Sequence, residues 1–150
     1  MLLWWGRLSP LPGGKFLFSL LVGLLIPYTG TMRSRVLTLV PGHAKVLLRD
    51  RRHVRNHLRS VHAIALANVA EYSTGLAVLS GMPSGFNGIL IKLTVDYTKK
   101  ARGDLLAECK TEVPEFKERT EVPVVSEIRD SSGDIVCTAC LLYTSPSPRD

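Results

Sequence analysis

Three side chains that could do chemistry on a carbonyl group stand in the middle of the chain: Asn56, His62 and Glu71. A carboxylate can activate water or attack a carbonyl carbon, and amide or imidazole groups can orient either reactant by hydrogen bonding. Each residue also has a structural interpretation, because a glutamate can belong to a solvated helix face, a histidine can cap a helix and an asparagine often shapes a turn. The spacing of these residues and the elements that carry them must decide between the catalytic and the structural interpretation.

The segment 60–79 is rich in alanine and leucine and contains no proline, which predicts the main helix of the fold. Ser60 is the expected N-cap, and Gly81 with Pro83 is expected to end the helix.

Helix geometry constrains how the three side chains could meet. Nine residues turn a helix through roughly 900°, so His62 and Glu71 would lie on nearly opposite faces, about 13 Å apart along the axis. They cannot share a site within one chain. In a two-fold dimer, Glu71 of one subunit can approach Asn56 and His62 of the other, so an enzymatic site here requires a dimer.

After this helix the hydrophobic period changes from about 3.6 to 2, which indicates strands. Ile89, Ile91, Leu93, Val95 and Tyr97 alternate with polar residues and predict a half-buried strand. Further strands are expected over 36–40, 44–49, 105–113, 122–128 and 134–139, with Pro123 favouring an edge or a bulge. One alanine-rich helix followed by an antiparallel meander is an α+β layout.

The most apolar stretch is 16–28, which has two interpretations. Only 17 uncharged residues separate Lys15 from Arg33, whereas a spanning helix needs about 20 mostly apolar residues. We expect a buried or groove-lying helix and a cytoplasmic protein. A signal sequence or membrane anchor remains the alternative, since the basic flank and the apolar length also suit one.

Composition sets the remaining bounds. A chain of 150 residues, 45% hydrophobic and 21% charged, suits one globular domain. The net charge of +6 favours anionic partners. No aromatic residues interleave the basic ones and no reader motif occurs, so we expect no nucleic-acid binding.

Residues 140–150 match the translation of a transposase sequencing adapter at every position. A natural Pro/Ser-rich tail is the alternative. We expect a single domain over 1–139 with an N-terminal helical extension over 1–35, and a last strand that stops near Ala139. Cys137 and Cys140 formally make a CxxC pair, but no second pair or histidine cluster completes a zinc site, so we expect no metal.

Two motifs resemble those of hotdog-fold thioesterases. The run Asn56-His-Leu-Arg-Ser-Val-His62-Ala-Ile, with Glu71 nine positions after His62, is similar to Asn-x-x-Gly-x-x-His-Gly-Gly plus an acidic residue in phenylacetate-pathway thioesterases. Residues 96–105 resemble the strand-turn-strand segment of the same enzymes. Pro27-Tyr28, Arg55-Asn56-His57 and Ala101-Arg102-Gly103 resemble a thioesterase-like hotdog family of unassigned function, over about residues 4–139.

This resemblance implies a curved antiparallel sheet wrapped around one central helix, which the small residues Ala63, Ala65, Ala67 and Ala70 would suit. It further implies an acyl-CoA thioesterase that works as a homodimer or a dimer of dimers. Glu71 would be the base or nucleophile, Asn56 and His62 would assist, and the backbone N–H groups of Ala63 and Ile64 would stabilise the oxyanion.

The same resemblance has departures that concern catalysis. Arg59 stands where those enzymes have glycine, Ala63-Ile64 replaces Gly-Gly, and Glu71 replaces the commoner aspartate. A non-catalytic domain that binds acyl-CoA or another acyl ligand is therefore the alternative function.

Basic residues at the second motif could bind the carrier of the acyl group. Lys99, Lys100 and Arg102 lie at the strand turn, where they could reach the phosphates of coenzyme A, although solvated turn charges are the simpler interpretation. Coenzyme A thioester would enter as substrate, and no separate cofactor is expected.

Overall fold

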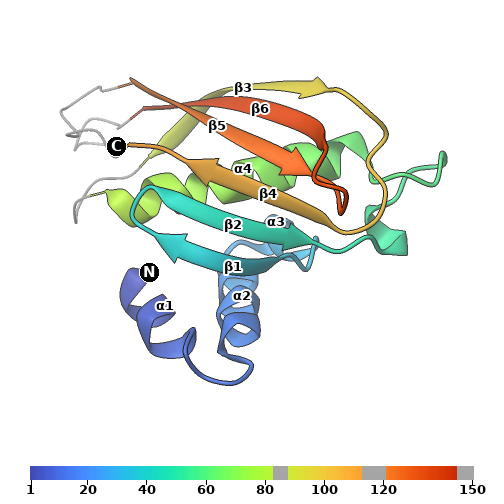
Figure 1. Ribbon diagram of the computed structural model, residues 1–150. Coiled ribbons are helices and arrows are strands. Elements are labelled where there is room, and N and C mark those ends of the chain that lie inside the picture. The colour runs from blue at the N-terminus through green and yellow to red at the C-terminus, as the bar shows by residue number, and fades with distance from the viewer. Residues whose placement is uncertain (83–87, 113–120, 145–150) are drawn as a thin grey trace.

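One antiparallel sheet and one long helix laid across its face form the body of the protein (Figure 1). The computed structural model describes residues 1–82, 88–112 and 121–144. Six strands pair in the order β1-β2-β4-β5-β6-β3, always antiparallel. Their bounds are β1 Arg35–Val40, β2 His43–Leu48, β3 Ile89–Tyr97, β4 Leu105–Lys110, β5 Glu121–Arg129 and β6 Ile135–Thr144. The expected α+β layout is confirmed.

The long helix α4, Ala63–Gly81, starts later than predicted. Its N-cap is His62, whose Nδ1 accepts a hydrogen bond of 3.1 Å from the Ile64 amide. The prediction of Ser60 as N-cap is wrong, because the Ser60 amide and hydroxyl both donate to Asn56 Oδ1 in the preceding loop. The helix ends at Gly81, as predicted.

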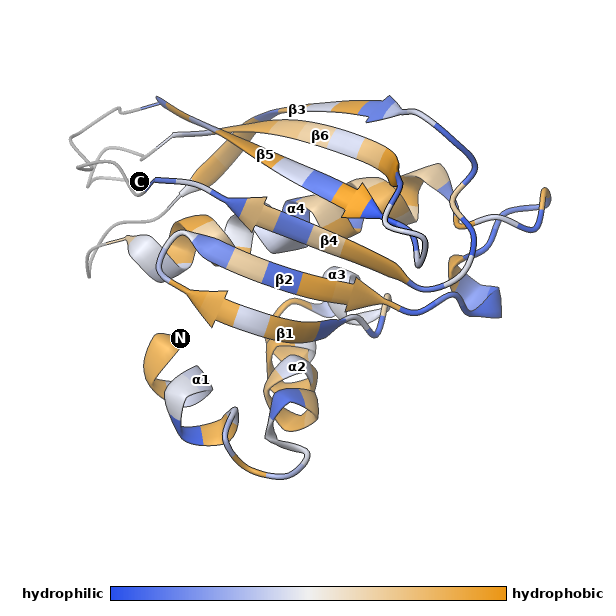
Figure 2. Ribbon diagram, in the orientation of Figure 1, coloured by the Kyte–Doolittle hydropathy of each residue, from blue (hydrophilic) through white to orange (hydrophobic). Residues whose placement is uncertain are grey.

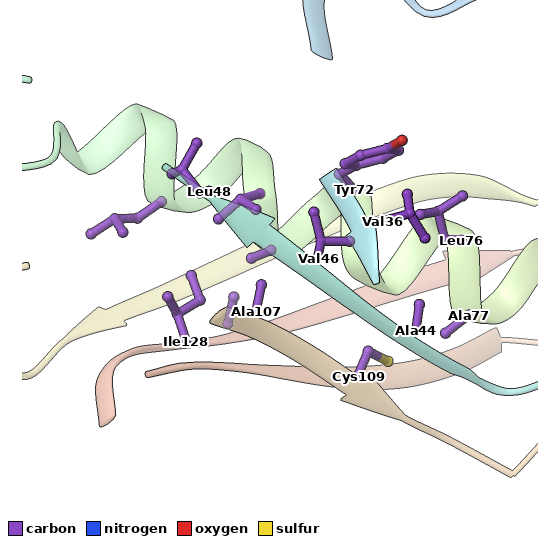
Figure 3. Close-up of a cluster of buried hydrophobic side chains, with 14 of the residues drawn as sticks. Val36, Ala44, Val46, Leu48, Tyr72, Leu76, Ala77, Ala107, Cys109 and Ile128 are labelled. Carbon is purple, nitrogen blue, oxygen red and sulfur yellow. The ribbon is translucent and has the colours of Figure 1, made fainter. Parts of the chain in front are cut away.

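Small side chains let α4 lie close to the sheet. Ala65, Ala70 and Ala77 are each less than 5% exposed. Figure 3 shows how Tyr72, Leu76 and Ala77 of α4 gather with side chains of β1, β2, β4 and β5 in one apolar cluster. At about 25 cal/mol per Å² of buried apolar surface, this cluster is the main stabilising contact of the domain.

The prediction of a half-buried β3 is wrong for the single chain. Ile89, Ile91, Leu93 and Tyr97 are each between 40% and 50% exposed. The reason is positional: β3 lies at the edge of the sheet, and α4 packs against the other five strands without covering β3. Of the five alternating side chains only Val95 packs against the core, and the described part of the chain leaves the other four exposed.

The proline in β5 sits where one side of the strand is unpaired. Residues Glu121–Arg129 of β5 pair with β6, whereas the pairing with β4 extends only over Ser126–Arg129. Pro123 therefore lies in the part of β5 that has one described neighbour, which agrees with the expected edge-like position.

The last strand continues beyond its predicted end. Cys140 to Thr144 belong to β6, and Leu141 and Tyr143 are buried in the core. These residues complete the pairing with β3 and β5. Cys137 is buried and Cys140 exposed, because residues three apart in a strand point to opposite faces, so the two do not form a dithiol pair. The adapter origin of 140–150 stays a prediction.

Three helices precede the sheet: α1 Leu2–Leu8, α2 Gly14–Leu25 and α3 Pro27–Gly30. Of these, α1 and α2 lie beside β1 (Figure 1), and α3 packs against α2 and α4. Trp5 of α1 packs edge-on against Phe18 of α2, with ring centroids 5.1 Å apart. The Ser19 hydroxyl accepts a hydrogen bond of 2.9 Å from the Val36 amide and so ties α2 to β1. Hydrophobic residues make up most of α2 (Figure 2). Several large apolar side chains of α1 and α2 are exposed, including Leu3, Trp4, Leu24 and Leu25.

Within the described residues, α4 alone is long and apolar enough to cross a membrane by length and composition. It is the core helix, and 67% of that window is buried inside the fold. The candidate segment 16–28 forms the shorter helix α2 and the start of α3.

The connection from β2 to α4 contains a short 3₁₀ helix, Arg52–Val54, and one residue with an unusual backbone. Arg59 has φ of 56°, in the left-handed region that side chains other than glycine rarely adopt. This is the position at which the resembling enzymes carry glycine. Arg59 thus adopts a backbone conformation that glycine would adopt at lower cost.

We predict that Arg59→Gly will remove a backbone cost of about 1–2 kcal/mol in the folded state. This gain should offset the extra conformational entropy that glycine gives the unfolded chain, which lowers stability by about 0.4–1 kcal/mol. The variant should be as stable as the parent or slightly more stable in urea unfolding. Arg51→Gly is the matched control, because Arg51 has φ of −125° and gains nothing from glycine. Equal destabilisation by both substitutions would contradict the prediction.

Candidate functional site

The two motifs singled out in the sequence lie against each other in space. Asp50 connects them: its carboxylate accepts hydrogen bonds from Arg55 Nε at 2.6 Å and from the Gly103 amide at 2.9 Å. The Asp50 amide in turn donates to Asp104 Oδ1. A further backbone bond joins the Val61 amide to the Ala101 carbonyl at 2.9 Å. The loop before α4 is therefore fixed to the turn between β3 and β4.

The role of Asp50 was not predicted from the sequence. Its side chain is only 10% exposed. The Arg55 hydrogen bond outweighs the opposing effect of burial and lowers the pKa of the Asp50 carboxyl. No local sequence pattern identifies this role, because one of its partners, Gly103, lies far along the chain.

Asn56 shapes the loop with its side-chain oxygen. Its Oδ1 accepts from the Leu58 amide at 2.9 Å, the Ser60 amide at 3.2 Å and the Ser60 hydroxyl at 3.1 Å. The carbonyl half of the amide is therefore fully used within the loop. Only its Nδ2 group could act on a ligand, and the rigid turn fixes the direction of that group.

The His62 side chain accepts the hydrogen bond of one of the two backbone N–H groups that were expected to stabilise the oxyanion. The Ile64 amide donates to His62 Nδ1, so that N–H group points at the cap and not toward a ligand. The Ala63 amide makes no hydrogen bond to any group in the described ranges. Ala63 also accepts at its carbonyl from the Tyr97 hydroxyl at 3.1 Å, which links the start of α4 to β3.

Glu71 lies in a stripe of α4 that the sheet does not cover. Between Ile64 and Ser80 the residues that are not buried are spaced three or four apart, and we call them the α4 stripe: Ile64, Ala67, Glu71, Gly75 and Leu79. Such spacing places them on one helix face. Glu71 is the only charged residue of the whole helix.

Burial raises the pKa of the Glu71 carboxyl, and no cation of the described residues counters this effect. Tyr143 of β6 packs beside this turn of the helix. Its hydroxyl lies 3.5 Å from the backbone carbonyl oxygen of Glu71 and 2.8 Å from the Thr74 hydroxyl. A partly buried carboxylate with a raised pKa and no ion pair is typical of a general base.

Within the single chain, Asn56, His62 and Ala63 belong to the loop before α4 and the start of that helix, and Glu71 does not. His62 caps the N-terminus of α4, and Glu71 follows two and a half turns later. The intrachain separation expected from helix geometry is therefore present.

The three residues expected to bind phosphate differ in whether a carboxylate neutralises their charge. Lys99 Nζ lies 2.8 Å from Asp130 and 2.6 Å from Asp134, so its charge is neutralised by the hairpin between β5 and β6. Lys100 and Arg102 are exposed and have no carboxylate partner within 1–82, 88–112 and 121–144. In that same part of the chain no group of three potential metal ligands occurs.

Solved structures share this fold. A crystal structure described as a genomics target is 30% identical, covers 86% of this chain and 87% of its own, and has a TM-score of 0.79. A Pseudomonas aeruginosa protein of unknown function, described as a "probable thioesterase", is 22% identical over 91% of this chain and 97% of its own, with a TM-score of 0.79.

A phenylacetic acid degradation-related protein from Ralstonia eutropha is 18% identical, covers 79% of this chain and 89% of its own, and has a TM-score of 0.68. The hotdog fold expected from the sequence is confirmed. No curated protein matches the chain. The model of a domain of unknown function, DUF4442, matches residues 14–142. The resemblance to a thioesterase-like family of unassigned function is thereby confirmed, and the chain belongs to the DUF4442 family.

Proposed function

We propose that the protein hydrolyses an acyl thioester, in the manner of an acyl-CoA thioesterase, at a site formed between two copies of the chain. The observation that carries this proposal is Glu71: one charged residue, with a raised pKa, at the centre of an otherwise uncharged helix stripe. A partly buried carboxylate without a neighbouring cation lowers the stability of the fold, and proteins commonly retain such destabilising groups at functional sites.

The apolar surface around Glu71 supports a dimer. Among the described residues nothing buries the α4 stripe or the side chains of Ile89, Ile91, Leu93 and Tyr97, and β3 is an edge strand of the described sheet. Exposed strand edges with apolar side chains favour pairing with another chain. A second copy joined at β3 would cover both surfaces and, by two-fold symmetry, bring its own loop 50–62 toward Glu71.

The chemistry follows from the groups that would then meet. Glu71 would take a proton from water as the resulting hydroxide attacks the thioester carbonyl, and the thiolate would leave when the tetrahedral intermediate collapses. The Ala63 amide and Asn56 Nδ2 of the partner subunit would donate to the oxyanion. Lys100 and Arg102, exposed at the adjoining turn, would bind the phosphates of coenzyme A.

A non-catalytic acyl-ligand domain is the second candidate. It is favoured by the His62 cap, which engages the Ile64 amide and leaves Ala63 as the remaining backbone donor of the predicted pair. The Ile64 side chain is also 56% exposed at the place where the resembling enzymes have glycine. Binding of acyl-CoA without hydrolysis would favour this candidate. For either function we propose a cytoplasmic homodimer.

Glu71→Gln should leave the fold and the dimer intact and lower acyl-CoA hydrolysis by about 10²- to 10⁴-fold, the usual cost of removing a general base. Steady-state assays over several acyl chain lengths would measure the loss. Full activity in Glu71→Gln would exclude Glu71 as the base.

The same variant should be more stable than the parent at neutral pH. Because the folded-state pKa of Glu71 is raised, its ionisation lowers stability as pH rises from the unfolded pKa to the folded pKa, and the penalty is absent below both. The gain in thermal midpoint should therefore be largest near pH 7 and fade toward about pH 4.

Glu108→Gln provides the control of opposite sign. Burial would raise the pKa of Glu108, but its hydrogen bonds with Lys110, His43 and Lys45 lower it overall. This substitution should therefore destabilise the protein at neutral pH. If Glu71→Gln also destabilised it, the assigned desolvation of Glu71 would be wrong.

Subunit mixing tests whether the site crosses the interface. Asn56→Asp retains the acceptor oxygen that holds the loop and removes the Nδ2 donor, so it suits this test better than alanine. After exchange between inactive Glu71→Gln and Asn56→Asp subunits, heterodimers would restore about a quarter of the parental sites. No recovery despite demonstrated exchange would place both residues in one subunit's site.

A further inference from the structure

A second candidate site lies at the opposite edge of the sheet from β3. A cavity of about 940 Å³ opens between α2, α3, the start of β1 and the segment that follows β2. One wall is apolar and includes Leu20, Leu24 and Pro27, while four arginines line the remainder: Arg33, Arg35, Arg49 and Arg51. No residue of α4 is among those that line the cavity, so it is distinct from the α4 stripe.

The four arginines lack the partners that would make them a structural ion network. None forms a salt bridge within the described residues, and no acidic side chain lines the cavity. Asp50, which lies between two of them in sequence, is already bonded to Arg55 and Gly103. Grouped like charges repel one another, so their free energy falls when an anion enters.

A buried hydroxyl adds an unmet polar group to the same wall. Ser34 lines the cavity, is 9% exposed, and its Oγ has no hydrogen-bond partner in the described part of the chain. Burying such a group costs about 1–3 kcal/mol unless a partner is supplied. Its neighbour Arg33 has φ of 50°, again in the left-handed region. Unmet polar groups and unusual backbone conformations concentrate where ligands bind.

The floor of the cavity is fixed by close helix packing. Gly23 of α2 and Gly30 of α3 both line it, and a Cβ atom at Gly30 would collide with the Gly23 carbonyl. The Arg35 guanidinium lies 5.6 Å from the centre of the Phe16 ring, which orients one cation beside the apolar wall. The site therefore has a preformed apolar side and a preformed basic side.

We propose that this cavity binds an anionic amphiphile, with a phosphate or carboxylate head on the arginines and a hydrocarbon tail along α2. Guanidinium groups bind both kinds of head by paired hydrogen bonds. The tail would cover the apolar side chains of α2 that are exposed, among them Leu20 and Leu24. A purely polar anion would leave that wall uncovered, and a neutral lipid would leave the arginines unpaired.

Calorimetric titration of the full chain with dodecyl phosphate, below its micelle concentration, tests the proposal. We expect saturable binding with one ligand per chain, much weaker binding of inorganic phosphate, and none of neutral dodecyl maltoside. The double substitution Arg49→Gln and Arg51→Gln should weaken binding by at least about tenfold, because it removes charged hydrogen bonds. Both arginines are exposed, so the variant should fold.

Arg7→Gln is the matched control, since Arg7 is an exposed arginine of α1 outside the cavity. It should bind as the parent does, and so should Glu71→Gln, which separates this site from the proposed hydrolase. Dodecanoate in place of dodecyl phosphate distinguishes a carboxylate head from a phosphate head, and binding of either supports the site. Equal affinity for the neutral detergent, or no effect of the double substitution, would overturn the proposal. Binding only to vesicles of anionic lipid would overturn it too, and would assign the arginines to a membrane surface.

Discussion

The packing of α4 against one sheet is the contact on which the rest of the structure depends. The helix is apolar or small on nearly every side, as helices are when other elements surround them. Five strands and α3 contact the helix, but the residues of the α4 stripe are not buried, and Ile89, Ile91, Leu93 and Tyr97 of β3 are exposed. The α4 stripe and the exposed side chains of β3 are the surfaces that the second copy of our proposal would cover.

The loop before α4 is ordered by polar contacts instead of apolar ones. Asp50 holds the turn of the second motif, Asn56 closes the loop on itself, and His62 caps the helix. These contacts explain why the spacing of Asn56 and His62 can be kept although Arg59 has replaced glycine at a left-handed position. In these contacts Asn56 and His62 use hydrogen-bonding atoms to hold the loop and the helix start. The choice between hydrolase and binding domain therefore depends on the donors that remain, the Asn56 Nδ2 group and the Ala63 amide.

Sequence patterns predicted the elements well because each has a period or a breaker of its own. The helix, the strands and their α+β order follow from alanine content, alternation and the glycine and proline turns. Burial was less predictable: the alternation of Ile89 to Tyr97 indicates an apolar face but not whether this chain or another one covers it. The prediction of Ser60 as the N-cap was wrong because Asn56, four residues earlier, accepts the hydrogen bond of the Ser60 hydroxyl. Asp50 and the arginine cavity depend on contacts between segments far apart in sequence, which no local pattern reveals.

The distribution of charge links the two sites. A chain with a net charge of +6 would ordinarily place some cation near any carboxylate, and a nearby cation would lower the pKa of Glu71 and weaken it as a base. Here four arginines are held at the β1 edge, Arg55 is held by Asp50, and Lys99 is held by two aspartates, so burial alone acts on Glu71. A second copy that covered Glu71 with the apolar face of β3 would increase its desolvation further without adding a cation. The four arginines of the cavity lie at the β1 edge of the sheet, whereas the carboxylate that we propose as the base lies on the core helix.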